Sequence, residues 1–327
     1  MHLSYTTYNV RYMSKAKIII GDVRTAMQSI PDQSVQTCIT SPPYWGLRDY
    51  GQGDQIGLEE TPDEYVNQMV QVFREVWRVL KDDGTLWLNI GDSYAGNMSR
   101  ASNNGRAGFG SEREGVFNRM PDGLKPKDLV GIPWRLAFAL QADGWYLRQD
   151  IIWAKPNPMP ESVTDRCTKS HEYVFLLSKS RQYFFDHVGI KEPVATNVGD
   201  AKIKFGGNKY GDSDDPKHAT KSGNVWVPSD TRNKRDVWTI ATKPYKGAHF
   251  AVMPEALVEP CILAGSAVGD TVLDPFTGSG TVAMVALRHN RNFVGTELNP
   301  EYAELAVDRI YNDAPLLNEI EKELANG

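Results

Sequence analysis

Thr271-Val-Leu-Asp274-Pro-Phe-Thr-Gly278-Ser-Gly280-Thr-Val-Ala283 predicts a short buried strand that turns through a glycine loop into a helix. Gly278, Gly280 and Ala283 fit the Gly-x-Gly-x-x-Gly/Ala pattern of a nucleotide-binding turn. Glycines let the backbone come close to a ligand, and the first turn of the helix offers free N–H groups. The next predicted strand ends at Glu297, nineteen residues after Gly278, where an acid can accept hydrogen bonds from two ribose hydroxyls.

The glycine loop lies unusually late in the chain. Only 49 of the 327 residues follow Gly278, whereas each strand–helix–strand unit takes roughly 30 residues or more. Most strands of the sheet must therefore come from the part of the chain that precedes the loop. The order of the elements is permuted, with the ligand loop last.

Seven short runs rich in Ile, Val, Leu and Trp predict buried strands. They are 17–20, 35–40, 85–90, 145–153, 172–178, 271–274 and 293–297. Helical patterns alternate with several of them: one starts at the capping box of Thr61 and Glu64, and others cover 129–142, 254–264 and 299–311. Strands that alternate with helices predict an α/β fold with a mostly parallel sheet.

Composition excludes several classes of protein. Hydrophobic residues make up 41% and charged residues 24%, which excludes disordered, collagen-like and coiled-coil chains. No apolar run reaches 18 residues, so no membrane span is expected, and three cysteines are too few for a disulfide framework or a zinc site. We expect a cytoplasmic protein. The net charge of −5 does not exclude nucleic acid, because residues 296–327 alone carry −6.

A second motif follows the predicted strand 35–40. It is Ser41-Pro42-Pro43-Tyr44. Two prolines remove two N–H donors, so their carbonyls and the Ser41 hydroxyl remain as acceptors at the carboxyl end of a strand, where ligands bind in open α/β sheets. With the flat face of Tyr44 beside them, these acceptors suit an amino group on a planar ring. A proline-rich turn with a packing tyrosine is the alternative.

The two motifs together, in this order, resemble the beta group of DNA exocyclic-amino methyltransferases, and the resemblance covers most of the chain. Further segments look like other blocks of that family. They are Ile20-Gly-Asp22, Trp153-Ala-Lys-Pro-Asn157, His171-Glu-Tyr173 and His249-Phe-Ala-Val-Met-Pro-Glu255. The resemblance implies a Rossmann-like, mostly parallel, seven-stranded methyltransferase sheet that is circularly permuted.

The resemblance also implies S-adenosylmethionine as the methyl donor. By that comparison, Asp274 and the loop after it would hold the methionine part, Glu297 the ribose and Asp22 the adenine, and Phe250 would close over the cofactor. The complete set of implied cofactor-binding residues is Asp22, Phe250, Asp274, Pro275, Phe276, Gly278, Ser279, Gly280, Thr281 and Glu297. Alternatives are that Phe250 is ordinary core and that Asp22 caps a helix.

Ser41, Pro42, Pro43 and Tyr44 are the implied catalytic residues. The family's cytosine-amine members usually carry serine at the Ser41 position, which favours N4-cytosine methylation of double-stranded DNA. An N6-adenine enzyme, whose relatives more often carry Asp or Asn there, is the alternative. RNA methylation and a non-catalytic DNA-binding protein on a methyltransferase scaffold are weaker alternatives. A nicotinamide dehydrogenase would fit the glycine turn but not the permuted order.

The resemblance also suggests how the chain is divided. The catalytic domain is expected over 15–185, with a flexible loop at 96–126, and again over 249–312, followed by an acidic tail at 313–327. The irregular segment 186–248 lies where the family keeps its target-recognition region. Lys155, Arg232, Lys234 and Arg235 are the candidate DNA-binding residues. A cognate restriction endonuclease and a second copy of the chain are the protein partners that this family suggests, and no metal site is expected.

Overall fold

The computed structural model describes residues 14–47, 55–95, 123–194, 230–242, 252–314 and 318–325. The chain divides into two compact units. The first comprises Met1–Asp186 together with Asp236–Gly327, and the second comprises His187–Arg235.

Strands and helices alternate along the first unit, as the sequence predicts. The strands are β1 (Ser14–Ile20), β2 (Val35–Thr40), β3 (Leu80–Ile90), β4 (Tyr146–Ala154), β5 (His171–Ser178), β8 (Val237–Thr239), β9 (Thr271–Asp274), β10 (Asn292–Glu297) and β11 (Asn318–Leu324). The helices are α1 (Val23–Ala26), α2 (Pro62–Val79), α3 (Ile132–Ala142), α4 (Glu255–Gly265), α5 (Thr281–Arg288) and α6 (Pro300–Asp313), with a 3₁₀ turn at Met27–Ser29. The capping box that predicts α2 is present, since the Thr61 hydroxyl accepts from the Glu64 N–H and the Glu64 carboxylate accepts from the Thr61 N–H.

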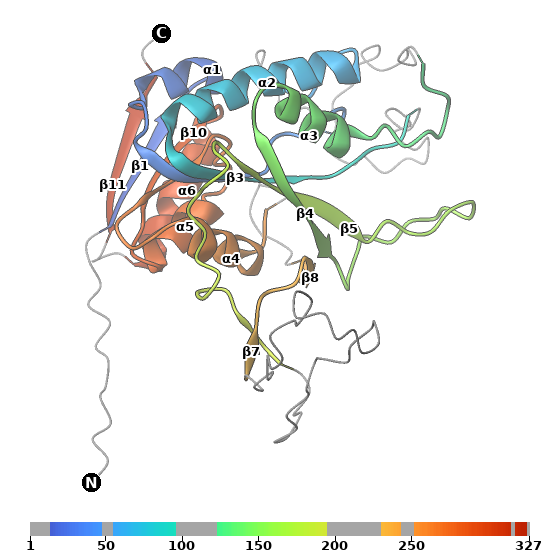
Figure 1. Cartoon of the computed structure of the whole chain (residues 1–327). Helices are drawn as coiled ribbons and strands as arrows, with labels where there is room; N and C mark the ends of the chain where they lie inside the picture. Colours follow the sequence, from blue (N-terminus) through green and yellow to red (C-terminus); the bar gives the residue numbers. More distant parts are fainter. Residues whose placement is uncertain are drawn as a thin grey trace, which may run out of the picture. The chain divides into compact units, whose positions relative to one another are not determined.

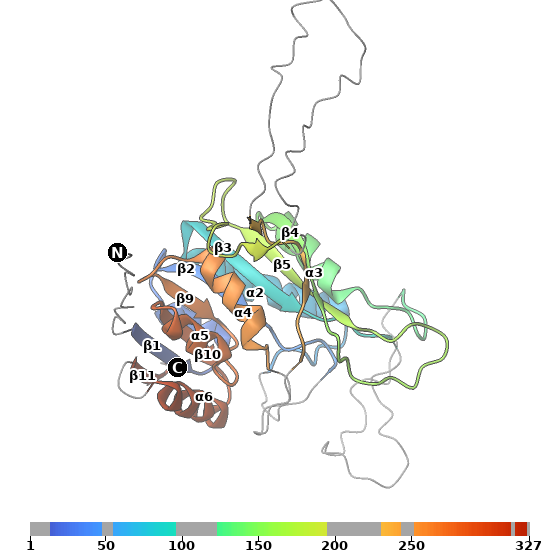
Figure 2. The ribbon, with the colours of Figure 1, turned by 90° about the horizontal axis from the view of Figure 1, so that it is seen from below.

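The strands form one sheet in the order β11-β1-β10-β9-β2-β3-β5-β4-β8. Every pairing is parallel except β3–β5 and β4–β5, because β5 runs against its neighbours. The prediction of a permuted, mostly parallel α/β sheet is therefore confirmed. Helices cover both faces, with α1, α2 and α3 on one side and α4, α5 and α6 on the other (Figures 1 and 2).

The sheet is wider than predicted. The seven predicted strands are all present, but β8 and β11 extend the edges, which gives nine strands among the described residues. The prediction of an acidic tail over 313–327 is thus wrong for 318–324. These residues form β11, which pairs with β1. Two of its acids, Glu319 and Glu323, form ion pairs with Lys15 and Lys17 of β1.

The direction of the strands brings many predicted residues to one edge of the sheet. The carboxyl ends of β1, β10, β9, β2 and β3 share this edge because these strands are parallel. Antiparallel β5 contributes its amino end there, and β4 contributes its carboxyl end, since Ala154 lies opposite His171. We call this the active edge. In open α/β sheets ligands bind at such an edge.

The second unit is small and contains one antiparallel pair, β6 (Glu192–Pro193) with β7 (Thr231–Arg232). It ends at Arg235, earlier than the predicted boundary at residue 248. The reason is that β8 pairs with β4, with Trp153 opposite Trp238, so Asp236 onward belongs to the first unit.

Candidate active site

The glycine loop follows β9 at the active edge and leads directly into α5. Gly278 and Gly280 have φ values of 51° and 76°, in the left-handed region that favours glycine. The Thr277 N–H donates to the Thr296 carbonyl at 3.0 Å, which ties the loop to β10. Ser279 and Thr281 are buried, and both accept hydrogen bonds from Arg309 of α6. The predicted strand–turn–helix unit is therefore confirmed.

Asp274 is a buried acid at the end of β9, with 2% of its surface exposed. One carboxylate oxygen accepts from the Thr40 hydroxyl at 2.7 Å and from the Phe276 N–H at 3.0 Å. Burial raises the pKa of Asp274 to about 7 in spite of these hydrogen bonds, and the nearby charge of Glu297 adds to the rise. A cation bound here would stabilise the ionised form.

Glu297 ends the neighbouring strand β10 and is half-buried. Its two oxygens each accept a backbone N–H, from Gly278 at 2.8 Å and from Asn299 at 2.9 Å. Burial raises its pKa, and the backbone hydrogen bonds oppose that rise. Each oxygen keeps a further lone pair, so Glu297 can accept hydrogen bonds from two hydroxyl groups of a ligand.

Asp22 follows β1 and lies one strand away from Glu297, whose carbonyl accepts the Gly21 N–H at 2.9 Å. It caps α1 by accepting the Arg24 N–H at 2.8 Å, which is the alternative that the sequence left open, and it forms an ion pair with the Arg24 side chain. Burial alone would raise the pKa of Asp22, but Arg24 outweighs burial and lowers it. Phe250 lies outside the described residues.

The Ser41–Tyr44 motif follows β2 at the same edge. The Pro43 carbonyl accepts from the Tyr65 hydroxyl at 2.9 Å, which fixes the turn to α2. The Tyr44 ring packs against the backbone of Gly91, where an added Cβ would lie 2.7 Å from the ring. A small hollow opens beside the ring and is lined in part by Tyr44, Gly91 and Asp92.

The two predicted motifs meet through one hydrogen bond. Thr40, the residue directly before Ser41, donates to Asp274, directly before the glycine loop, although 234 residues separate the two in sequence. The contact follows from strand order, since β2 and β9 are neighbours and Cys38 lies opposite Leu273. The active edge therefore has two parts: a glycine-loop side with Asp22, Asp274 and Glu297, and a tyrosine side with Ser41–Tyr44.

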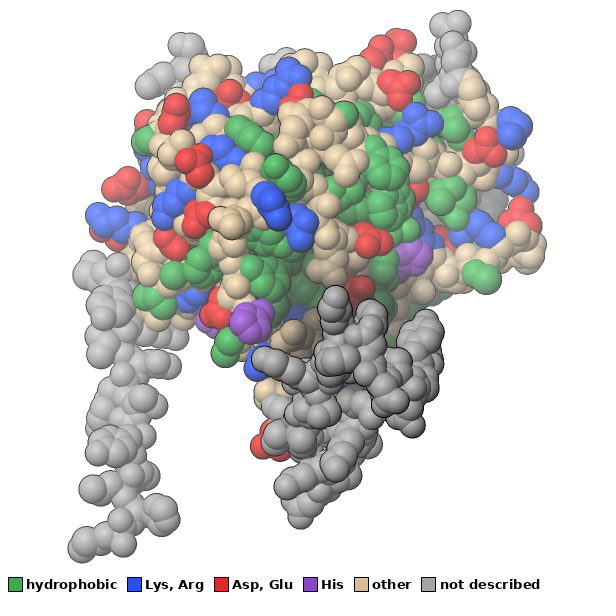
Figure 3. Space-filling model, in the orientation of Figure 1, with side chains coloured by type: hydrophobic (Ala, Val, Ile, Leu, Met, Phe, Trp, Pro, Cys, Tyr) green, Lys and Arg blue, Asp and Glu red, His purple; other side chains and the backbone are tan. Residues whose placement is uncertain are grey.

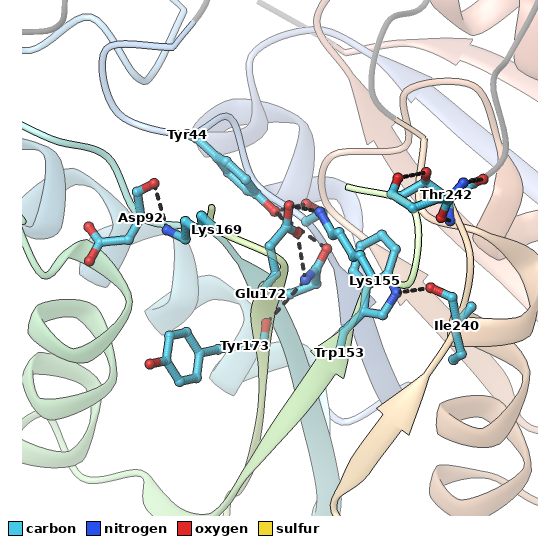
Figure 4. A network of polar contacts seen from close by, with 12 residues as sticks. Tyr44, Asp92, Trp153, Lys155, Lys169, Glu172, Tyr173, Ile240 and Thr242 are labelled. Atoms are coloured by element: carbon cyan, nitrogen blue, oxygen red, sulfur yellow. Dashed lines mark hydrogen bonds and ion pairs between the residues drawn. The ribbon is translucent and has the colours of Figure 1, made fainter. Parts of the chain in front are cut away.

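The tyrosine side holds a polar network that the sequence did not predict (Figure 4). One oxygen of Glu172 accepts from the Tyr44 hydroxyl at 2.8 Å and from the Asn89 amide at 3.2 Å. The other oxygen is paired with Lys155. Lys155, predicted only as a DNA-binding residue, also lies 4.2 Å from the centre of the Trp153 ring.

A signal for Glu172 was available in the sequence. It lies at one end of the predicted strand 172–178, just as Asn89 lies at one end of 85–90. Which end of β5 meets the active edge depends on the direction of that strand, and the residue pattern does not encode this direction.

The other predicted DNA-binding residues belong to the second unit. Arg232 and Arg235 donate to the same oxygen of Glu192, at 2.8 Å and 2.7 Å. Lys234 lies between them in sequence. Their contact with DNA remains a prediction.

Among the described residues, no helix is long and apolar enough to cross a membrane. Nor does the described part contain a group of three or more His, Cys, Asp or Glu side chains placed to hold a metal ion. Charged side chains of both signs are interspersed over the face of the molecule shown in Figure 3.

The chain is similar in sequence to known DNA methylases over most of its length. A family model described as DNA methylase matches residues 35–308. Type II methyltransferase M.SmaI of Serratia marcescens is 51% identical, over 91% of each chain. Type II methyltransferase M.Cfr9I of Citrobacter freundii is 47% identical, over 92% of this chain and 89% of its own.

Two solved structures share the fold. PvuII DNA methyltransferase (cytosine-N4-specific) aligns over 95% of this chain and 96% of its own, with a TM-score of 0.60 and 19% identity. A putative DNA modification methylase of Thermus thermophilus, complexed with S-adenosyl-L-methionine, aligns over 95% of this chain and 99% of its own, with a TM-score of 0.59 and 23% identity.

Proposed function

This chain belongs to the DNA methylase family, and we propose that within it the chain methylates the N4 amine of cytosine in DNA. At the coarser level, the chain is a type II DNA methyltransferase that uses S-adenosylmethionine and acts on an exocyclic amine. The choice between cytosine and adenine is the part that we infer.

The residues of the glycine-loop side fit the cofactor. S-adenosylmethionine, when bound, supplies a methyl group on a positively charged sulfur. Asp274 is a buried carboxyl that a cationic ammonium would stabilise in its ionised form. Glu297 has lone pairs for the two ribose hydroxyls, and it already holds the glycine loop through Gly278. We propose that Asp22 binds the adenine and that Phe250 closes over the cofactor.

The tyrosine side fits the target amine. An exocyclic amine is conjugated with its ring, is a poor nucleophile and is unreachable inside a duplex, so the base must be flipped out. The Ser41 hydroxyl and the Pro42 carbonyl would accept its two N–H groups, which favours a pyramidal nitrogen with an available lone pair. Tyr44 would stack on the base. The main catalytic work is positioning.

The observation that carries the proposal is the hydrogen bond from Thr40 to Asp274. It couples the residue before the amine motif to the residue before the cofactor loop, so a base held by Ser41 would lie beside a donor held by Asp274.

Cytosine is favoured over adenine by Ser41 itself, because the family's cytosine-amine members usually carry serine at that position. N6-adenine methylation is the alternative.

Double-stranded DNA is the proposed substrate, with 186–248 as the region that reads its sequence. Lys155, Arg232, Lys234 and Arg235 are the proposed DNA contacts. A restriction endonuclease that cuts the same site, a homodimer and a cytoplasmic location are further proposals, drawn from the type II relatives.

One experiment tests the target base. Polymerase-copied genomic DNA, which carries no methyl groups, is incubated with the protein and S-adenosylmethionine, digested to nucleosides and examined by mass spectrometry. We expect N4-methylcytosine. N6-methyladenine would overturn the cytosine assignment alone, whereas an absence of any methylated nucleoside, with intact cofactor binding, would contradict the catalytic assignment.

A further inference from the structure

Glu172 and Lys155 form an ion pair that is largely withdrawn from water. Each side chain is only 17% exposed. Removing two charges from water is costly and is repaid only when the remaining lone pairs and protons find partners. In this pair, Glu172 also accepts hydrogen bonds from Asn89 and Tyr44, and the Lys155 ammonium lies over the Trp153 ring. A pair this well satisfied holds Glu172 in one place.

That fixed carboxylate anchors the far end of the Tyr44 ring. The hydroxyl of Tyr44 donates to Glu172 at 2.8 Å, and the Ser41 hydroxyl donates to the same tyrosine oxygen at 3.4 Å. Burial raises the pKa of Tyr44 well above its ordinary value, so the hydroxyl stays a donor. One side edge of the ring, at Cε2 and Cδ2, lies against Gly91, which has no side chain to displace it. The ring is therefore held at its hydroxyl and along one edge.

We propose that Glu172 is a positioning residue for methyl transfer, which acts through Tyr44 and is itself held by Lys155. The inference rests on the proposed role of Ser41–Tyr44 in binding the target base. A ring held in one orientation offers the flipped base one plane on which to stack. The fixed Tyr44 oxygen also orients the Ser41 hydroxyl, which donates to it. Glu172 should thus affect the rate of methyl transfer more than the binding of either substrate.

A double-mutant cycle tests this route. Glu172→Ala removes the anchor, Tyr44→Phe removes the anchored hydroxyl but keeps the ring, and the third variant carries both changes. Methyl transfer is measured as radiolabel incorporated into polymerase-copied DNA under single-turnover conditions, so the result does not depend on which base is methylated. Each single change is expected to slow transfer by about tenfold, typical of a lost hydrogen bond to a charged group.

The double variant should be no slower than the slower single variant, because both changes remove one interaction. Cofactor affinity and the DNA concentration for half-maximal rate should stay within about twofold, since a residue used only for positioning contributes little to ground-state binding. A matched control is Asp143→Ala, which removes a similarly buried carboxylate, 18% exposed, from its pair with Arg74 away from the active edge. It should keep the wild-type rate.

Two results would overturn the proposal. One is multiplication of the two single effects in the double variant, which would mean that Glu172 acts independently of Tyr44. The other is a loss confined to DNA affinity. If Glu172→Ala does not fold, Lys155→Met with Glu172→Met removes both charges together and takes its place in the cycle. A methyltransferase that methylates adenine would leave this test unchanged, so the two proposals fail separately.

Discussion

Asp274 and Glu297, on the glycine-loop side, accept hydrogen bonds from N–H and O–H groups, and no lysine or arginine pairs with them among the described residues. Glu172, on the tyrosine side, is paired with Lys155 and holds two further donors. All three carboxylates lie at one edge of one sheet. Within the described residues, Asp274 and Glu297 therefore lack a cationic partner, whereas Asp22 on the same side is paired with Arg24 and Glu172 on the other side is paired with Lys155.

This contrast indicates which acids face a ligand. A buried carboxylate without a cation has a raised pKa and gains most when a cationic partner arrives, which suits the ammonium of a cofactor. A carboxylate already paired gains little from a ligand and acts on protein groups instead. This division can be tested through cofactor affinity, methyl transfer, the effect of pH and DNA binding.

The greatest effect is expected from the unpaired acids. Asp274→Ala and Glu297→Ala should each weaken S-adenosylmethionine binding by about ten- to a hundredfold, because each removes a charge-assisted hydrogen bond worth roughly 1.5–3 kcal/mol. Isothermal titration calorimetry on the folded variants measures this. Glu172→Ala serves as the control, and it should bind the cofactor like the wild type. Unchanged affinity in both acid variants would remove the cofactor assignment.

On the tyrosine side, substitutions should slow catalysis and spare the cofactor. Tyr44→Ala removes a stacking surface, and base–aromatic stacking is worth about 1–3 kcal/mol per base, so a loss of roughly tenfold or more is expected. Ser41→Ala removes one neutral hydrogen bond and should cost about two- to tenfold. The test is the rate of methyl transfer at saturating DNA, with cofactor affinity measured in parallel. A variant that transfers methyl at the wild-type rate would disprove the role given to that residue.

Cofactor affinity should depend on pH through Asp274. Its pKa is raised from 3.8 to about 7, so below that pH the carboxyl is mostly neutral and attracts a cation less. Affinity should fall as the pH drops below about 7, by up to tenfold per unit. Without ligand, the folded protein holds the Asp274 proton more tightly than the unfolded chain does. The contribution of Asp274 to the free energy of unfolding therefore declines as the pH rises from 3.8 to about 7.

Asp274→Asn is the control for this dependence. Calorimetry at pH 5.5, 6.5 and 7.5 (about two units in all) should show a slope for the wild type and a nearly flat line for the variant. An equal slope in both would assign the titration to another group.

The smallest effect is expected in the second unit. Neutralising Lys234 and Arg235 together should weaken DNA binding severalfold and flatten its salt dependence, by about one unit of slope for each lost phosphate contact. Fluorescence anisotropy over a series of salt concentrations measures both. Because Arg235 also pairs with Glu192, Glu192→Gln is needed beside it to separate a lost DNA contact from a loosened β6–β7 pair. DNA affinity and salt slope equal to wild type would refute the assignment.

Local pattern was enough to predict most of the sheet. The predicted strands 35–40 and 271–274 coincide with β2 and β9, because continuous apolar runs bounded by turns are typical of strands buried on both faces. β11 was missed, since Asn318-Glu-Ile-Glu-Lys-Glu-Leu324 reads as a polar tail. It pairs along its whole length with β1, about 300 positions earlier, and a local pattern contains no information about so distant a partner.

Some residues of the candidate site could likewise be predicted from local pattern, and others could not. Asp274, Glu297 and Ser41 could be predicted because each directly follows or ends a recognisable strand with a recognisable turn. The network of Glu172 and Asn89 could not, because it depends on the direction of β5 and on partners distant in sequence, Tyr44 after β2 and Lys155 after β4. The pairing of Lys155 with Glu172 could not be predicted for the same reason, and the role of Lys155 as a DNA contact stays a prediction.

The order of the strands also governs how this protein can fold during its synthesis. β1 and β2 are made first, but they are separated in the finished sheet by β10 and β9, which are made some 230 residues or more after β2. The ribosome must therefore release almost the whole chain before the centre of the sheet can close, and until then the edges of β1 and β2 lack their partners. Contacts this distant in sequence slow folding and prolong exposure to aggregation. Truncated chains that end before Thr271 would contain the amine motif but never β9, the neighbouring strand that completes it.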